Sequence, residues 1–249
     1  MMRYLNRKND QMRPVSFEMG LLRHAEGSCK VHFGLTEILV SASVENQIPP
    51  FLRGQNRGWL SAQYALMTRS TPTRNDRRRQ LDDGRSREIS RLIGRSLRSV
   101  IDFERLGERQ IMIDCDVIDA DAGTRTAAIT GGFMALAQAC HYLVQHQFIE
   151  SNPLKDSVSA VSIILKNQSL LLDPDYLEDS TADSDTNFVF TGKGQIVEAQ
   201  ASAEKNTFSC ETFTQSLYLA QKTCAKIRQL QKTCLQKSHI DSAIFDSSF

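Results

Sequence analysis

Segments of alternating apolar and polar residues, joined in pairs by short turns, constrain the fold of this chain more than any other feature. In residues 28–33 and 36–44 apolar side chains fall at every second position, and Gly34 lies between the two segments. Such alternation is typical of strands with one buried face, and the short turn favours an antiparallel hairpin. The same pattern predicts two further hairpins, at 158–165 with 169–172 and at 187–189 with 195–199.

Helical periodicity separates these hairpins. Apolar residues recur every three to four positions over 88–101, in the segment that follows Thr126, and over 211–236, which predicts helices with a buried face. A further strand is predicted at 110–120. Hairpins interspersed with helices predict an α+β fold, with mixed and antiparallel sheets packed against helices in a β-α-β arrangement, rather than a doubly wound parallel sheet.

The composition is that of a globular protein. The chain has 249 residues, of which 41% are hydrophobic and 24% charged, and these values exclude disorder or a fibrous repeat. We expect residues 1–240 to form one domain and the mostly polar residues 241–249 to form a disordered tail. The longest apolar runs, such as 158–165, are too short for a membrane span, and no apolar segment after the basic start suggests a signal peptide.

The six cysteines are scattered, without C-x-x-C pairs or histidines at ligand spacing. This arrangement argues against a zinc site and against a disulfide framework. Most of the cysteines fall at apolar positions of predicted strands or helices, where a free thiol acts as a small buried hydrophobe. We therefore expect a reduced, cytoplasmic protein.

Positive charge is concentrated in one part of the chain, although the net charge is only +1. Ten arginines and four acidic residues lie between Arg69 and Arg98. Residues 69–79 lack apolar periodicity, which predicts an exposed, mobile loop, and four arginines of the following helix share one side, namely Arg87, Arg91, Arg95 and Arg98. Such charge suits a phosphate backbone. Alternatively, Arg91, Arg95 and Arg98 pair with the acidic cluster at residues 173–185 or across a subunit interface. We assign the loop to RNA and part of the helix to structure.

A glycine, a hydroxyl and a guanidinium meet at the predicted start of a helix, in Gly123-Thr124-Arg125. A glycine lets the backbone approach an anion, helix-start amides bind it, and an arginine fork matches a phosphate group. The alternative is a simple turn with an exposed arginine, which this short string alone favours. The pattern is not that of a Walker loop.

Four carboxylates lie within eight residues, at Glu178, Asp179, Asp183 and Asp185. Oxygen ligands at this density suit Mg²⁺, which takes one or two protein carboxylates plus substrate phosphates. An EF-hand is excluded, because Phe188 and Gly194 stand where that loop needs glycine and glutamate. A solvated acidic turn is equally consistent with this cluster alone. No Ser-His-Asp or Cys-His arrangement stands out.

Taken together, these strings resemble the ribonuclease PH family over roughly residues 3–236. The resemblance is carried by eight strings in the family's order, at residues 10–15 (DQMRPV), 25–28 (AEGS), 50–54 (PFLRG), 58–59 (GW), 87–98 (REISRLIGRSLR), 113–125 (IDCDVIDADAGTR), 173–187 and 197–200 (VEAQ). One departure is that the family commonly has Gly-Gly-Thr-Arg where this chain has Ala122-Gly123-Thr124-Arg125. A methyl group there is tolerated unless the first residue needs a positive φ.

The resemblance implies a ribonuclease PH fold and a phosphorolytic 3′→5′ exoribonuclease. Inorganic phosphate would attack the terminal phosphodiester of transfer RNA precursors and other structured RNA 3′ ends, releasing nucleoside diphosphates. The resemblance assigns phosphate binding to Arg85, Gly123, Thr124 and Arg125, Mg²⁺ or Mn²⁺ binding and catalysis to Asp179 and Asp185, and RNA binding to Arg69, Arg74 and Arg77. It also implies a homo-hexamer, built as a trimer of dimers, and no membrane partner.

Two other function classes compete with this expectation. The same fold also provides non-catalytic RNA-binding subunits of ring assemblies, in which the arginine or aspartate positions are lost. All of these positions are present in this chain. A metal-dependent hydrolase that uses water is the weaker rival, because it would have little use for a second phosphate site.

Overall fold

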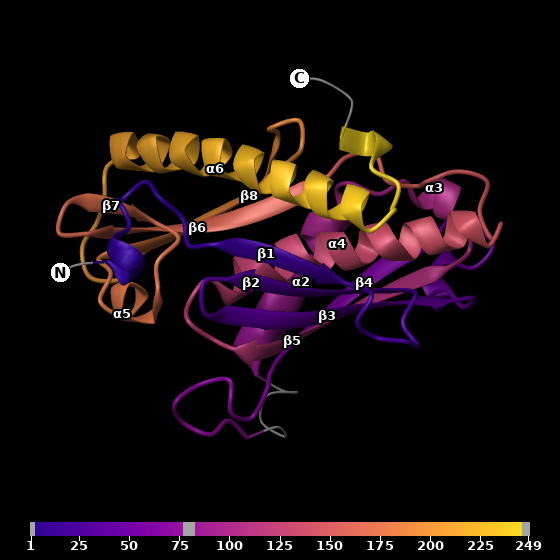
Figure 1. Ribbon diagram of the computed structural model, residues 1–249, viewed down its shortest axis with the longest axis horizontal. Helices are drawn as coiled ribbons and strands as arrows, with labels where there is room; N and C mark the ends of the chain where they lie inside the picture. The colour runs from indigo at the N-terminus through magenta and orange to yellow at the C-terminus, as the bar shows by residue number, and fades with distance from the viewer. Residues whose placement is uncertain (1–2, 77–82, 246–249) are drawn as a thin grey trace.

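The computed structural model describes residues 3–76 and 83–245. Two sheets form its framework (Figure 1). The first has the strand order β1-β2-β3-β5-β4, with β1 (Val15–Met19), β2 (Gly27–Phe33), β3 (Thr36–Glu45), β4 (Trp59–Leu66) and β5 (Gln110–Asp119). The second has the order β7-β6-β8-β9, with β6 (Val158–Lys166), β7 (Ser169–Leu172), β8 (Ser184–Thr191) and β9 (Ile196–Ala203). The fold is α+β, as predicted.

Five helices and three short 3₁₀ turns complete the described chain. The helices are α2 (Gly84–Arg98), α3 (Phe103–Leu106), α4 (Thr124–Gln145), α5 (Tyr176–Asp179) and α6 (Cys210–Lys237), and the turns span Tyr4–Asn6, Pro50–Leu52 and Ala243–Phe245. Side-chain caps mark several helix starts: Asp83 accepts a hydrogen bond from the Ser86 amide, and Ser209 accepts one from the Thr212 amide.

The predicted hairpins are confirmed, and the sheets contain more strands than predicted. β2 pairs antiparallel with β3, β6 with β7, and β8 with β9. β1 and β4 were not predicted. β4 pairs parallel with β5, and α2 connects these two strands, so the one parallel contact described in the first sheet belongs to a β-α-β unit.

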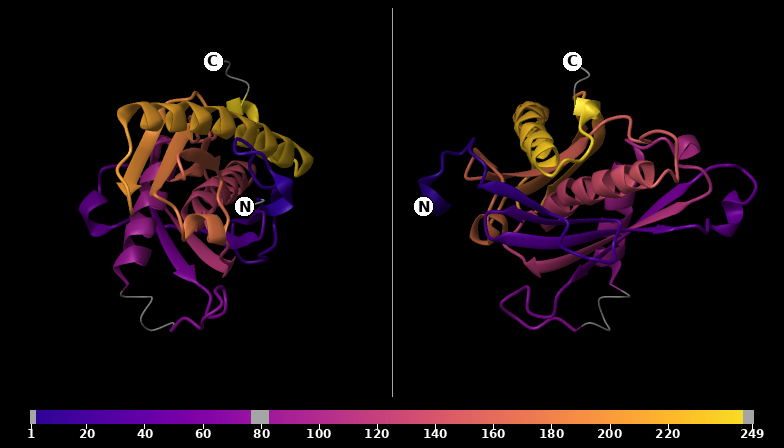
Figure 2. Two further views of the ribbon diagram at one scale, coloured as in Figure 1. Left: turned by 90° about the vertical axis from the view of Figure 1, so that its left-hand side faces the viewer. Right: turned by 45° about the vertical axis from the view of Figure 1, so that its right-hand side comes forward.

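Helix α4 lies between the two sheets and supplies much of the core (Figure 2). It packs on β2, β3 and β5 of the first sheet and on β6 of the second. The approach is close, because a Cβ atom on Gly131 would lie 2.5 Å from Val31 Cγ1. Helix α4 is long and apolar enough to cross a membrane. However, 78% of its most apolar stretch is buried inside the protein, as expected of a core helix.

Helix α6 covers one face of the second sheet (Figure 2). Phe188 and Phe190 of β8 pack with Cys224 of α6 in a second apolar cluster. Gln231 of α6 is fully buried and donates hydrogen bonds to the carbonyl oxygens of Thr130 on α4 and Val158 on β6. The two helices and the second sheet therefore form one packed unit.

The described part of the predicted disordered tail is ordered. Phe245 is only 4% exposed, packs edge-on against Phe133, and its carbonyl oxygen accepts a hydrogen bond of 2.9 Å from Arg228. The polar composition after residue 240 concealed these apolar contacts, and the prediction is wrong for 241–245. Residues 246–249 lie outside the described chain.

Candidate active site

The loop between β5 and α4 has an unusual backbone. Ala122 and Gly123 both adopt left-handed conformations, with φ of 59° and 65°, before the helix starts at Thr124. Alanine at such a φ costs about 1–2 kcal/mol. The Ala122 carbonyl oxygen accepts a hydrogen bond of 2.6 Å from the Thr36 hydroxyl, which helps to hold the peptide in place. The first residue of the family's Gly-Gly pair therefore does need a positive φ, and this chain has alanine there.

The side chains of this loop are held from two sides. Thr124 Oγ1 accepts a hydrogen bond of 2.8 Å from the hydroxyl of Tyr64, on β4. Arg125 Nη1 donates one of 3.1 Å to Gln200, on β9, and Gln200 in turn donates to Glu88. Burial raises the pKa of the Tyr64 hydroxyl, so this group remains a hydrogen-bond donor at neutral pH. The loop joins the first sheet to the second at this point.

Two carboxylates from α5 and the second sheet line the same cavity as this loop. Asp179 ends the short helix α5, and Asp185 lies on β8. Burial, followed by the nearby charge of Asp185, raises the pKa of Asp179 to about 6, although Arg125 and Arg85 act against this. Burial likewise raises the pKa of Asp185, against the lowering effect of Arg125. Both carboxyl groups are therefore costly to ionise unless a cation joins them.

One cavity of about 400 Å³ collects these groups. It is lined by all six residues predicted for phosphate and metal binding, which are Arg85, Gly123, Thr124, Arg125, Asp179 and Asp185. Arg69 and Arg74 do not line it; they are exposed on the loop after β4, of which Thr71–Thr73 and Asn75 do line it. Arg77 lies outside the described residues. The lining residues that sequence reasoning missed include Tyr64, Ser162, Tyr176 and Asn187.

A chain of polar contacts runs from Asp185 to the loop backbone. Asn187 donates to Asp185 Oδ2 (2.9 Å), Ser162 Oγ donates to Asn187 Oδ1 (2.7 Å), and Ser162 contacts Thr126 Oγ1 (3.4 Å). Thr126 donates to the carbonyl oxygen of Gly123 (2.9 Å). Asn187, Ser162 and Thr126 are all buried. The D-x-N spacing was the only sequence signal for this arrangement.

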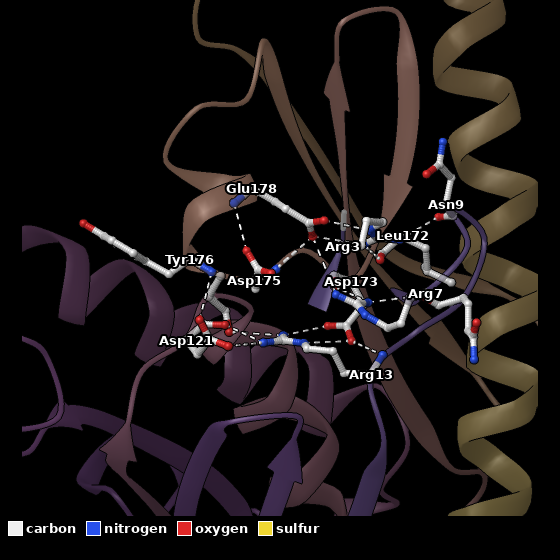
Figure 3. Close-up of polar contacts among 12 residues, drawn as sticks. Arg3, Arg7, Asn9, Arg13, Asp121, Leu172, Asp173, Asp175, Tyr176 and Glu178 are labelled. Carbon is white, nitrogen blue, oxygen red and sulfur yellow. Dashed lines mark hydrogen bonds and ion pairs between the residues drawn. The ribbon is translucent and has the colours of Figure 1, made fainter. Parts of the chain in front are cut away.

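Three arginines near the N-terminus hold the acidic segment before α5 (Figure 3). We call Arg3, Arg7 and Arg13 the arginine clasp. Arg13, 1% exposed, forms ion pairs with Asp173 (2.8 Å) and Asp121 (3.3 Å). Arg3 pairs with Glu178 at 2.7 Å, and Arg7 lies 3.6 Å from the same carboxylate. The clasp fixes α5, and with it Asp179, against the loop that contains Gly123.

The acidic cluster of the sequence divides in space. Glu178 is bound by the clasp, whereas Asp183 accepts hydrogen bonds from the Asn206 side chain and from the Asn167 amide in the turn between β6 and β7. Only Asp179 and Asp185 line the cavity. No group of three or more His, Cys, Asp or Glu side chains that could hold a metal occurs in residues 3–76 and 83–245. Two carboxylates facing a phosphate site are nevertheless the donor set that Mg²⁺ commonly takes.

The arginines of α2 also differ in their surroundings. Arg85 lines the cavity, whereas Arg95 pairs with Glu198 (2.7 Å) and Arg98 lies over the Trp59 ring and donates to the Leu60 carbonyl oxygen. The prediction that part of this helix is structural is confirmed. The partner of Arg95, however, lies on β9 and not in the predicted acidic cluster.

The fold is that of exosome subunits. Rice (Oryza sativa) Rrp46 has a TM-score of 0.75 at 18% identity, over 92% of this chain and 98% of that one. An Archaeoglobus fulgidus exosome with RNA bound to the active site has a TM-score of 0.76 at 20% identity, over 91% of both chains. An archaeal exosome core has a TM-score of 0.74 at 20% identity, over 91% of this chain and 89% of that one. At these identities the likeness defines the fold class.

The sequence identifies the family within this class. The sequence model of the 3′ exoribonuclease family, domain 1, matches residues 11–140, and that of domain 2 matches residues 156–223. The chain therefore belongs to the 3′ exoribonuclease family of ribonuclease PH.

Proposed function

We propose that this protein is a phosphate-dependent 3′→5′ exoribonuclease that trims transfer RNA precursors and releases nucleoside diphosphates. The observation that carries the proposal is the single cavity in which Arg85, Thr124 and Arg125 face Asp179 and Asp185. Inorganic phosphate and the RNA phosphodiester are both anionic, so their reaction requires positive charge that is in place beforehand. The cavity supplies this charge from two arginines.

In the proposed reaction an oxygen of inorganic phosphate attacks the terminal phosphodiester phosphorus. The bond from that phosphorus to the 3′ oxygen of the preceding nucleotide breaks, and this oxygen takes up a proton. Arg85, Thr124 and Arg125 orient the attacking phosphate, with Arg125 itself oriented by Gln200. Mg²⁺ or Mn²⁺, held by Asp179 and Asp185, would neutralise charge on the phosphate oxygens.

The proposal extends to RNA recognition and assembly. Arg69 and Arg74 are exposed on a loop that continues into the cavity wall, which suits contact with a transfer RNA stem. Arg77 is assigned to the same contact from the sequence. As in the family, we propose a homo-hexamer built as a trimer of dimers. Because none of the six cysteines forms a disulfide, we also propose the reducing cytoplasm as its location.

Product analysis tests the activity directly. Purified protein would be incubated with a transfer RNA that carries extra 3′ nucleotides, with Mg²⁺ and with or without inorganic phosphate. We expect nucleoside diphosphates only when phosphate is present. Nucleoside monophosphates in both conditions would identify a hydrolase, and RNA binding without any product would identify a non-catalytic ring subunit.

Two variants and one matched control connect the activity to the cavity. Arg125→Ala and Asp185→Ala should abolish phosphorolysis while the far-UV circular dichroism spectrum stays unchanged. Asp183→Ala removes a carboxylate only two residues from Asp185 but outside the cavity, and should keep the wild-type rate. Wild-type rates in the first two variants would contradict the site assignment.

A further inference from the structure

The lining of the cavity combines two chemically different kinds of side chain. The charged ones are Arg85, Arg125, Asp179 and Asp185, and the apolar or aromatic ones include Leu66, Pro72, Ala120 and Tyr176. A nucleotide combines the same two kinds of group, since its phosphate is anionic and its base has flat, largely apolar faces. The charged side chains suit the phosphodiester, and the apolar and aromatic ones suit the base.

Tyr176 is the exposed one of the two aromatic residues in this lining. Its side chain is 54% exposed although it lines the cavity. Figure 3 shows the phenol ring pointing away from the arginine clasp. Among the described residues it stacks on no other ring, and its hydroxyl makes no hydrogen bond. A large aromatic surface is therefore offered to whatever enters the cavity.

The backbone under this ring is firmly held. The Tyr176 amide donates a hydrogen bond of 2.9 Å to Asp121 Oδ1, and Asp121 is itself paired with Arg13. Asp175 caps the helix start, where it and Glu178 form reciprocal hydrogen bonds. A ring on such a fixed backbone loses little further freedom when a ligand stacks on it.

We propose that Tyr176 is the stacking platform for the nucleobase at the 3′ end of the bound RNA. This inference rests on the proposed function. An aromatic face accepts every base, because each base has a π-face and stacking needs no hydrogen-bond pattern. That property fits an enzyme that must accept each successive terminal nucleotide. Tyr176 and Asp179 are the first and last residues of α5, so the platform and the carboxylate form one rigid unit.

The other tyrosine of the cavity has a different role. Tyr64 is 6% exposed, and its hydroxyl is committed to Thr124. Its ring is packed in the main core rather than presented to solvent. Tyr176 therefore offers the larger free aromatic surface of the two.

The test compares three variants by RNA affinity, measured by fluorescence anisotropy without phosphate so that no cleavage occurs. Tyr176→Ala should weaken binding of a single-stranded oligonucleotide about tenfold, the size expected for one stacked base. Tyr176→Phe keeps the ring and should bind like wild type. Leu177→Ala is the matched control, because Leu177 is the next residue, is 61% exposed and does not line the cavity.

A modified RNA locates the stacked base. An oligonucleotide with an abasic 3′-terminal nucleotide should bind wild type about tenfold more weakly, and should bind Tyr176→Ala no more weakly than the unmodified RNA does. Equal additional loss in both proteins would overturn the proposal. So would wild-type affinity in Tyr176→Ala, or a loss in Tyr176→Phe as large as that in Tyr176→Ala.

Steady-state kinetics separate this proposal from the proposed function. In an active enzyme Tyr176→Ala should raise KM for RNA about tenfold and leave KM for phosphate unchanged. If wild type binds RNA through Tyr176 but releases no nucleoside diphosphate, the enzymatic proposal fails and the platform stands. If wild type is phosphorolytic and Tyr176→Ala changes neither affinity nor KM for RNA, only the platform fails.

Discussion

Asp179 occupies an environment that favours function over stability. Its carboxyl group is partly buried beside Asp185, and no hydrogen bond to its side-chain oxygens is described among the residues of the structure. The resulting pKa of about 6 lies above the ordinary value of 3.8. The folded state therefore binds a proton at this site more tightly than the unfolded state, and the ionised carboxylate lowers the free energy of unfolding above pH 6.

The first prediction follows from the raised pKa of Asp179, which lowers the free energy of unfolding at neutral pH. Without divalent cations, Asp179→Asn should equal wild type in stability near pH 3.8 and exceed it at pH 8, by about 1–2 kcal/mol. The gain should develop between pH 3.8 and 6. Thermal unfolding across this range would measure it. Asp183→Asn is a control for which the opposite effect is expected. Hydrogen bonds from Asn206 and the Asn167 amide lower the pKa of Asp183. The Asp183→Asn variant should therefore be less stable than wild type at pH 8.

The second prediction concerns Ala122, whose φ is 59°. Ala122→Gly should raise the free energy of unfolding by about 0.5–1 kcal/mol, since relief of left-handed strain exceeds the entropic cost of glycine. Ala120→Gly, two residues earlier and without a positive φ, should lower it by a similar amount. Chemical denaturation measures both. A loss of stability in Ala122→Gly would show that the loop is not strained at this residue.

At the scale of single elements, local pattern predicted the fold well where pairing is local. The three hairpins and the helices of 84–98, 124–145 and 210–237 follow from periodicity. β4 was missed because small residues interrupt its apolar alternation and its partner β5 lies beyond α2. Residue chemistry alone marked Gly123-Thr124-Arg125 and the carboxylates Asp179 and Asp185 as candidates, whereas Arg85 was assigned only through the family resemblance. The arginine clasp was missed altogether, because Arg13 and Asp173 are 160 residues apart and no local pattern connects them.

The third prediction tests how strongly the clasp ties the N-terminal segment to the second sheet. Arg13→Ala should lower the free energy of unfolding by about 3–5 kcal/mol, because it leaves the buried Asp173 carboxylate without its partner. Lys30→Ala removes the solvent-accessible ion pairs with Glu18 and Glu37 and should cost much less than Arg13→Ala. Urea unfolding compares the two. Equal losses would contradict the view that the clasp is a main structural link.

At the scale of the whole molecule, the net charge is only +1, but the arginines are unevenly distributed over the chain. We propose that the exposed arginines of the loop after β4 contact RNA, whereas Arg95 of α2 is already paired with Glu198 of β9. Proteins that neutralise RNA phosphates release counterions, so the salt dependence of affinity counts such contacts. This dependence distinguishes arginines that bind RNA from arginines that only lie near it.

The fourth prediction uses this dependence. Arg69→Ala and Arg74→Ala should each weaken transfer RNA binding and reduce the slope of log affinity against log salt by about 0.7–0.9. Arg95→Ala, which removes an arginine bound to Glu198, should leave the slope unchanged. Binding titrations from low to moderate salt would give the slopes. An unchanged slope in both loop variants would remove the loop from the RNA contact.

The partners of the arginine clasp are synthesised long after the arginines themselves. Arg3 leaves the ribosome 175 residues before its partner Glu178, an interval on the order of ten seconds or longer at common rates of synthesis. Once the five strands of the first sheet and Asp121 have emerged, Arg13 can pair with Asp121, but Asp173 and Glu178 have still to be synthesised. Asp179 and Asp185, the carboxylates that line the cavity, are synthesised after its arginines. They lie in or close after the segment that the clasp binds. The cavity can therefore be completed only after the segment that contains Asp179, Asp185 and Asn187 has been synthesised.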